Sequence, residues 1–235
     1  MWACTLICRS WYTAAVPHLY PTLCIAFDDE NQRFEWSNPI QHMQTPTFLP
    51  FDKSVRISSR PQNALFPRLP NSNIIRGYPA LNNIQFLEIH ELDIPRLTRN
   101  IRRNFSHFLP KVRSLSLMAP KGSCQQIIFF IGLFRNLENI FLSEPDIPGG
   151  ELPDDPKLIP PFIPPLRGRL TARSIASAGL FKDMIHSFGR IQFHRFDLYD
   201  VPETQLLLDA CVNTLKGLHL YPDNLRGEPS CLRYI

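Results

Sequence analysis

The sequence of 235 residues lacks any apolar run that approaches the roughly 18 residues of a membrane-spanning helix. It also lacks a glycine-rich phosphate loop, a G-x-S-x-G nucleophile motif and an H-E-x-x-H metal motif. The nearest acidic cluster, Glu151 with Asp154 and Asp155, falls in a proline-rich stretch and is interpreted as solvated loop charge. The sequence therefore predicts a protein that is not an enzyme and that needs no cofactor.

Charge and cysteine content indicate no specialised partner or compartment. The formal net charge is only +4, and the charges are interspersed, so the footprint of a dedicated nucleic-acid binder is missing. Residues 1–8 lack the basic start and the cleavage site of a signal peptide. Because the cysteines show no pairwise spacing, we expect reduced thiols in a cytoplasmic or nuclear protein; they are Cys4, Cys8, Cys24, Cys124, Cys211 and Cys231.

The nearest approach to a metal site is Cys4 and Cys8 with His18 and Cys24. A three-residue gap followed by scattered partners is not the spacing of a zinc finger. Packing of a buried helix is the favoured interpretation, so no metal ligand is predicted.

What the sequence does contain is a spacing, apolar-x-x-apolar-x-apolar, that returns about every 25 residues. One degraded copy, Leu166 with Leu170 and Ala172, fills the widest gap between the clear copies, which gives six units. The five clear copies are Ile84, Leu87, Ile89; Val112, Leu115, Leu117; Leu137, Ile140, Leu142; Phe193, Phe196, Leu198; and Leu215, Leu218, Leu220.

The segments between these copies change to helical periodicity. A strand and a helix in each unit of about 20 to 29 residues is typical of leucine-rich-repeat solenoids, whose units must stack because one unit cannot bury its apolar face. The helical groups are Leu97, Ile101, Phe105, Phe108; Ile127, Ile128, Ile131, Phe134; Ile175, Leu180, Met184, Phe188; and Leu206, Leu207, Cys211.

The predicted fold class is therefore α/β: a leucine-rich-repeat-like solenoid with a curved parallel sheet and with helices and loops on its convex side. Val55 and Ile57 predict a first, irregular strand. No unit carries the Asn or Cys that usually follows the strand in such repeats, where its side chain satisfies turn amides. We therefore expect loose, uneven coils.

Residues 145–165 contain eight prolines, which predict a long loop in place of one convex helix. Two interpretations stay open for Pro160, Pro161, Pro164 and Pro165. They either pack over the back of the solenoid or form a polyproline II ligand for an SH3-like partner.

The N-terminal 50 residues have a different character. Residues 3–15 predict a short helix that ends before Pro17, and Leu23 to Phe27 predict a strand. Residues 28–50 are polar and contain three prolines, which predicts a connector with one short helix around residues 39–44.

The start of the chain resembles the last helix of the F-box motif, through Cys4, Leu6, Ile7, Cys8, Arg9, Ser10 and Trp11, followed by Leu19, Tyr20 and the predicted strand. With its repeats, and with details such as the run from Pro164 to Thr171, the whole chain resembles the F-box proteins with degenerate leucine-rich repeats that are abundant in mushroom-type fungi. The Leu-Pro-x-Glu-like start of the motif and the helix after it do not precede these residues. We therefore expect an N-terminally truncated F-box.

This resemblance implies three parts: an F-box remnant over residues 1–27, a connector over residues 28–50 and a degenerate repeat domain over residues 51–235. It implies the substrate-recognition subunit of a Skp1-cullin-F-box ubiquitin ligase, in the Ubl conjugation pathway. The residues that it assigns to a Skp1-type adaptor are Leu6, Cys8, Arg9 and Trp11.

Target binding is expected on the concave face of the sheet. If the second and third apolar positions of each unit point inward, strand alternation sends the residues between and after them to the opposite face. Aromatic and mixed polar groups there suit protein recognition. The ten predicted partner-binding residues are Glu88, His90, Ser116, Met118, Phe141, Ser143, Asp197, Tyr199, His219 and Tyr221.

Two alternatives to the ligase subunit stay open. The chain is alternatively a stand-alone repeat scaffold that binds another protein without Skp1. It is alternatively an RNA-binding solenoid, whose basic residues would follow a phosphate backbone. A solvated convex helix is the ordinary interpretation of those residues: Arg96, Arg99, Arg102 and Arg103, with Lys111 and Arg113 nearby.

Overall fold

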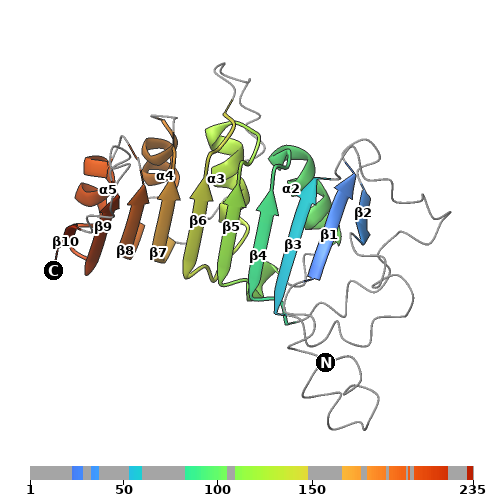
Figure 1. The fold of residues 1–235 in the computed structure, drawn as a ribbon, viewed down its shortest axis with the longest axis horizontal. Coiled ribbons are helices and arrows are strands. Elements are labelled where there is room, and N and C mark those ends of the chain that lie inside the picture. Colours follow the sequence, from blue (N-terminus) through green and yellow to red (C-terminus); the bar gives the residue numbers. More distant parts are fainter. Residues whose placement is uncertain are drawn as a thin grey trace, which may run out of the picture.

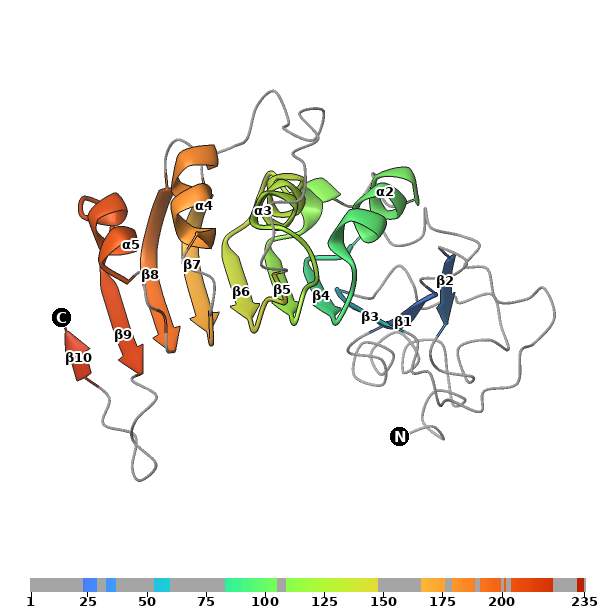
Figure 2. The same cartoon turned by 90° about the horizontal axis from the view of Figure 1, so that it is seen from above.

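In a computed structural model, the chain forms one ten-stranded sheet with helices on one face (Figures 1 and 2). The structure describes residues 23–28, 33–36, 53–59, 83–104, 109–147, 166–175, 179–188, 191–199, 201, 204–221 and 232–234. None of the helices in these ranges combines the length and apolar character that crossing a membrane requires. The strands are β1 Leu23–Asp28, β2 Arg33–Trp36, β3 Ser54–Ser59, β4 Phe86–His90, β5 Ser114–Met118, β6 Asn139–Ser143, β7 Leu166–Arg173, β8 Ile191–Tyr199, β9 Gly217–Tyr221 and β10 Leu232–Tyr234.

The strands lie in the sheet in the order β10-β9-β8-β7-β6-β5-β4-β3-β1-β2. Neighbours from β1 through β3 to β9 are parallel, whereas β2 and β10 add antiparallel edges. Parallel neighbours need a crossover connection. In the described ranges, helices on the same side of the sheet supply four of these crossovers, namely α2 Ile94–Asn104, α3 Cys124–Gly132, α4 Leu180–Phe188 and α5 Thr204–Cys211, while η5 Leu109–Lys111 is a short 3-10 turn (Figure 2). The predicted α/β class with a parallel sheet is confirmed, and the stacked strand-helix units are consistent with a solenoid-like architecture.

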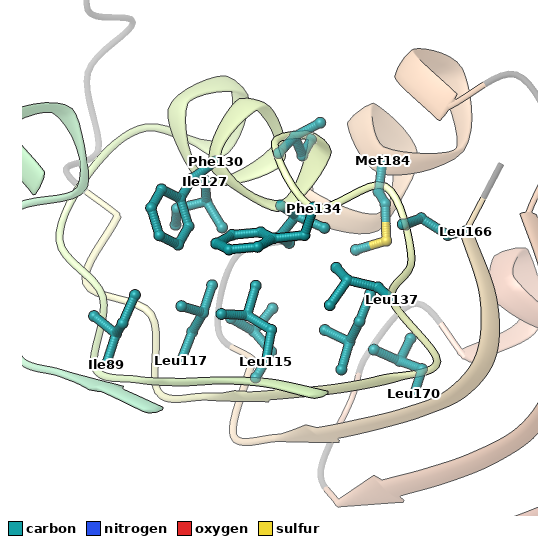
Figure 3. Packing of buried hydrophobic residues seen from close by; sticks show 14 of the residues in the cluster. Ile89, Leu115, Leu117, Ile127, Phe130, Phe134, Leu137, Leu166, Leu170 and Met184 are labelled. Carbon is teal, nitrogen blue, oxygen red and sulfur yellow. The ribbon is translucent and has the colours of Figure 1, made fainter. Parts of the chain in front are cut away.

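The repeated apolar positions align across the sheet and point toward the helices. Ile127 and Phe130 of helix α3, with Phe134 just after the helix, pack onto them (Figure 3), and the rings of Phe130 and Phe134 meet edge to face at 5.3 Å. The predicted inward orientation is therefore confirmed. One row contains Leu87, Leu115, Ile140, Leu170, Phe196 and Leu218, and the next contains Ile89, Leu117, Leu142, Ala172, Leu198 and Leu220; all are buried except the two β9 leucines, which are partly buried.

The degraded copy forms strand β7, whose Gly168 lies against the backbone of Glu138 just before β6. Gly168 has a φ of +95°, and a Cβ at this position would lie 1.8 Å from the carbonyl oxygen of Glu138. The amide of Arg169 donates to the same carbonyl at 2.7 Å. Only glycine permits this contact. Beside it the register with β8 shifts, from Gly168 opposite Phe193 to Arg169 opposite Arg195, which leaves His194 as an extra residue.

The turn after four successive strands is the same, although no Asn or Cys follows the strands. Glu91, Ala119, Glu144 and Ser174 have φ values of 53°, 45°, 48° and 49°. The amide of each donates to the last carbonyl of the next strand, at 2.8 to 3.1 Å. These four turns are therefore alike, whereas the helices that follow two of them differ in length, 11 residues for α2 and 9 for α3. Backbone groups of the neighbouring coil satisfy these turn amides without an asparagine side chain.

The described part of the N-terminal region confirms the two predicted strands, as β1 and β3. Residues 33–36, expected within a connector, form β2 and pair with β1, because Arg-Phe-Glu-Trp alternates polar and aromatic residues with the period of a strand. The predicted helices at residues 3–15 and 39–44, and residues 148–165 of the proline-rich loop, lie outside the described residues.

We expect Gly168→Ala to lower the free energy of unfolding by at least about 2 kcal/mol, because a side chain in this conformation costs about 1 to 2 kcal/mol before any overlap is counted. Gly179→Ala is the matched control, since a Cβ there meets nothing within 4 Å. Urea unfolding followed by circular dichroism measures both. Equal midpoints for the two variants would show that β7 does not depend on this contact.

Candidate docking face

The face of the sheet opposite the helices, called the open face below, carries three rows of side chains set by the strand register. All ten predicted partner-binding residues lie in the second and third rows. The first row is Ser54, Phe86, Ser114, Asn139, Arg169, Arg195 and Gly217; the second is Arg56, Glu88, Ser116, Phe141, Thr171, Asp197 and His219; the third is Ser58, His90, Met118, Ser143, Arg173, Tyr199 and Tyr221.

Exposure of the ten residues differs. Met118 is exposed and Phe141 is half-buried, so neither turns into the core. Ser143 and Asp197 are buried, with 4% and 2% exposure. The ten residues therefore share a face but differ in exposure, because alternation decides the face whereas the size of neighbouring side chains decides the exposure. Leu6, Cys8, Arg9 and Trp11, predicted to contact the adaptor, lie outside the described residues.

The arginines of this face are not among the predicted partner-binding residues. Arg169 and Arg195 occupy the first row, and Arg173 occupies the third row. Residues of the first row come just before the second apolar position of each unit. The predicted binding positions are only those between and after the second and third apolar positions. Strand β7 was excluded because its copy of the repeat is degraded. The signal that would have found its arginines is the alternation of polar and apolar residues from Leu166 to Arg173.

A buried carboxylate organises the part of the open face on β7, β8 and β9. Arg169 donates its Nε–H to Oδ2 of Asp197 at 2.5 Å, and Arg195 donates from Nε to Oδ2 at 3.3 Å and from Nη2 to Oδ1 at 3.4 Å. Nδ1 of His219 lies 2.8 Å from Oδ1 and donates when it carries the proton. Three strands thus contribute one cluster, defined here as the Asp197 cluster: Arg169, Arg195, Asp197 and His219.

The electrostatics of the Asp197 cluster keep the carboxyl ionised. Burial acts to raise the pKa of Asp197, but the hydrogen bonds from Arg195 and Arg169 and their positive charges outweigh it, so the pKa lies below its ordinary value of 3.8. Two guanidinium groups facing one carboxylate leave a net positive charge. This part of the open face therefore suits an anionic group.

An aromatic platform borders the Asp197 cluster. The rings of Tyr199 and Tyr221 stack with 4.0 Å between centroids and an interplanar angle of 2°, and His219 meets Tyr221 edge to face at 6.4 Å. Both tyrosines are partly exposed. Amphipathic rings held in a fixed orientation lose little entropy when a partner covers them.

The middle of the open face is hollowed. The small side chains of Ser114 and Ser116 form the floor of a hollow of ≈ 420 Å³, with Phe86 and Phe141 among its walls. On the β3 side, Arg56 pairs with Glu88 at 2.6 Å. Nε2 of the neighbouring His90 is buried without a hydrogen bond, since its 3.6 Å separation from Glu88 is too long for one.

The six basic residues considered for RNA do not gather on one surface. Arg99 and Arg102 are exposed on α2, Arg96 pairs with Asp93, and the side chain of Arg103 lies outside the description. Lys111 and Arg113 instead line a separate hollow of ≈ 820 Å³ at the N-terminal ends of β5, β6 and β7, with Arg135, Arg167 and Glu138 but without any α2 residue.

Comparisons with known proteins supply no relative: no family model, no curated protein and no solved structure matches the chain. Across the described ranges, His, Cys, Asp and Glu form no group of three or more that could hold a metal ion. Cys211 is a buried free cysteine, and burial raises the pKa of its thiol.

We expect Asp197→Asn to lower the free energy of unfolding at pH 7 by about 1 to 2 kcal/mol. This is less than the loss of one partner of a fully buried ion pair costs, because both arginines are partly exposed. The pKa of Asp197 is lowered by folding, so its stabilising contribution is present above pH 3.8 and is lost as the pH falls through the lower folded-state pKa. Urea unfolding of both proteins from pH 7 to pH 3 should show the difference shrinking at the acid end. Asp209→Asn on α5 is the control and should change stability little; a difference between wild type and Asp197→Asn that does not vary with pH would contradict this account.

Proposed function

We propose that the chain is a protein-interaction module that holds a target protein on the open face of a leucine-rich-repeat-like solenoid. The observation that carries this proposal is the Asp197 cluster beside the Tyr199–Tyr221 stack: charged and aromatic side chains from three strands are fixed in place and still partly exposed. Such groups give recognition at a low cost in entropy, because their rotamers are set before the partner arrives. The protein therefore acts by binding and not by catalysis.

The role proposed for this module is the substrate-recognition subunit of a Skp1-cullin-F-box ubiquitin ligase. Its support is the resemblance of residues 4–11, 19 and 20 to the last helix of an F-box, together with the stacked repeats that follow. In this arrangement the F-box remnant contacts the adaptor and the open face holds the target. A stand-alone scaffold that uses the same face without Skp1 is the second candidate.

An RNA-binding role has less support. The six basic residues considered for it do not lie along one surface, because the exposed arginines of α2 line no part of the hollow that contains Lys111 and Arg113. The organised face of the molecule is the open face.

The adaptor contact is tested by co-purifying this chain with a Skp1-type adaptor and cullin. We expect retention of the adaptor, and we expect Trp11→Ala to weaken it several-fold because a large apolar contact is removed. His219→Ala, on the open face, is the matched control and should leave adaptor binding unchanged. Absence of the adaptor from a folded preparation would favour the scaffold without Skp1.

The binding face is tested by placing a photo-crosslinking residue at Met118 and, as a control, at Val212. Both side chains are exposed, but Met118 lies on the open face whereas Val212 follows α5. In cells that express the protein, we expect discrete crosslinked partners from position 118, identified by mass spectrometry, and none of them from position 212. The same partners from both positions would contradict a specific role for the open face.

A further inference from the structure

We propose that the open face of β7 and β8 binds an extended, carboxylate-rich segment of the target protein. This inference rests on the proposed function and names the chemistry of its ligand. The surface concerned is called the arginine stripe and consists of Arg167, Arg169 and Arg173 on β7 with Arg195 on β8.

The arrangement of the charges favours a segment with several anionic groups. Strand alternation puts Arg167, Arg169 and Arg173 on the same side of β7, with Arg167 and Arg173 exposed and Arg169 partly exposed. Six residues of a strand span about 20 Å, so the positive charges form a line instead of a single pocket. One phosphate group would meet only part of this line. A chain with carboxylates at alternate positions would meet all of it, because its side chains repeat with the same period.

On β7, β8 and β9 the stripe has little opposing charge, whereas Glu138, just before β6, lines the same hollow as Arg167 and pairs with Arg113. At the open-face positions of β7, β8 and β9 that the structure describes, the carboxylate is that of Asp197, which is buried and already bonded to Arg169 and Arg195. A partner's carboxylates therefore meet guanidinium groups without a competing exposed acid on these strands. His219 adds a further positive charge whenever it is protonated.

Asp197 also positions two of the arginines. It binds the Nε edge of Arg169, and Arg169 has 44% of its side chain exposed. Arg195 is 41% exposed and faces Asp197 through Nε and Nη2. The two arginines are register partners on adjacent strands, which places their backbones about 4.8 Å apart. Their outer N–H groups thus form a paired donor set of the kind that binds carboxylates bidentately.

The remaining neighbours of the stripe are a hydroxyl group and an aromatic stack. Thr171 lies between Arg169 and Arg173 along β7, and Tyr199 is the register partner of Arg173. The Tyr199–Tyr221 stack therefore lies next to the end of the stripe, where an apolar side chain of the bound segment would pack against the rings.

The test uses the full chain and a fluorescein-labelled peptide of about ten residues in which Glu and Ser alternate, so that the carboxylates follow the strand period. Fluorescence anisotropy is measured against three other probes: the same peptide with Gln for Glu, a Gln-Ser peptide with one phosphoserine, and an RNA oligonucleotide of equal length. We expect the Glu-Ser peptide to bind tightest. Tighter binding of the Gln-Ser peptide, the phosphopeptide or the RNA would overturn the proposal.

Variants of the stripe locate the site. We expect Arg169→Gln, Arg173→Gln and Arg195→Gln each to weaken binding of the Glu-Ser peptide at least about fivefold, the loss of one charge-assisted contact. Lys182→Gln on α4 and Arg99→Gln on α2 each remove one positive charge from an exposed helix position. They are matched controls and should change affinity less than about twofold. An equal loss of affinity in all five variants would show that net charge alone attracts the peptide, and it would overturn the proposed site.

Asp197→Asn separates positioning from simple attraction, because it makes the protein more positive while releasing both arginines. Positioning predicts binding that is several-fold weaker, and simple attraction predicts tighter binding. A tighter complex would overturn the proposed role of Asp197. Thermal unfolding checks that Asp197→Asn is folded. If Asp197→Asn does not fold, Arg173→Gln still tests the site, because its exposed side chain lies outside the Asp197 cluster.

Failure of this inference is distinguishable from failure of the proposed function. Specific crosslinking from position 118 that persists in Arg169→Gln and Arg173→Gln, together with no binding of the Glu-Ser peptide, would reject the acidic ligand and keep the docking face. Absence of specific crosslinking from position 118 in the protein that carries no arginine substitution would reject the docking face itself.

Discussion

The alignment of two inward apolar positions across consecutive parallel strands is the constraint on which the rest of the structure depends. Each strand contributes side chains such as Leu115 and Leu117 to a core that is completed only by the units on either side and by the helices above. Burial of each such side chain stabilises the fold by about 1.5 to 3 kcal/mol. A register shift by one residue would move both rows to the other face, so the apolar spacing fixes the register.

The same constraint creates the candidate site. Once two positions of a strand are committed to the core, the positions between and beside them must face away from the helices. In β3 to β6 these positions hold mixed small, polar and aromatic groups, whereas in β7 to β9 they bring together Asp197, two arginines, a histidine and two stacked tyrosines. Residues more than twenty positions apart thus become neighbours at the strand spacing. The positive charges of the arginines stabilise the ionised form of Asp197, which burial alone would disfavour.

Backbone chemistry adapts the repeat to a sequence that departs from a regular pattern. Residues such as Ala119 and Glu144 adopt a left-handed conformation after their strands, and their amides bond to the neighbouring coil. Gly168 permits β7 to approach β6 where a side chain would collide with a backbone carbonyl. The left-handed backbone conformation of these residues costs free energy, and hydrogen bonds between neighbouring coils offset that cost. These hydrogen bonds explain why the turns remain uniform without the usual asparagine.

The sequence by itself determined the α/β class, the positions of β1 and of β3 to β9, the inward apolar rows and the face on which Glu88, Met118, Tyr199 and Tyr221 lie. These features follow from period-two and helical patterns, which are local properties of the chain. Only the tertiary structure decided that β2 joins the sheet, that Ser143 and Asp197 are buried, and that Arg169 and Arg195 meet the same carboxylate. Burial and ion pairing depend on which side chains stand opposite one another in neighbouring strands. That juxtaposition is set by the register between distant segments and by the glycine-dependent approach of β7 to β6, and no single segment's pattern encodes it.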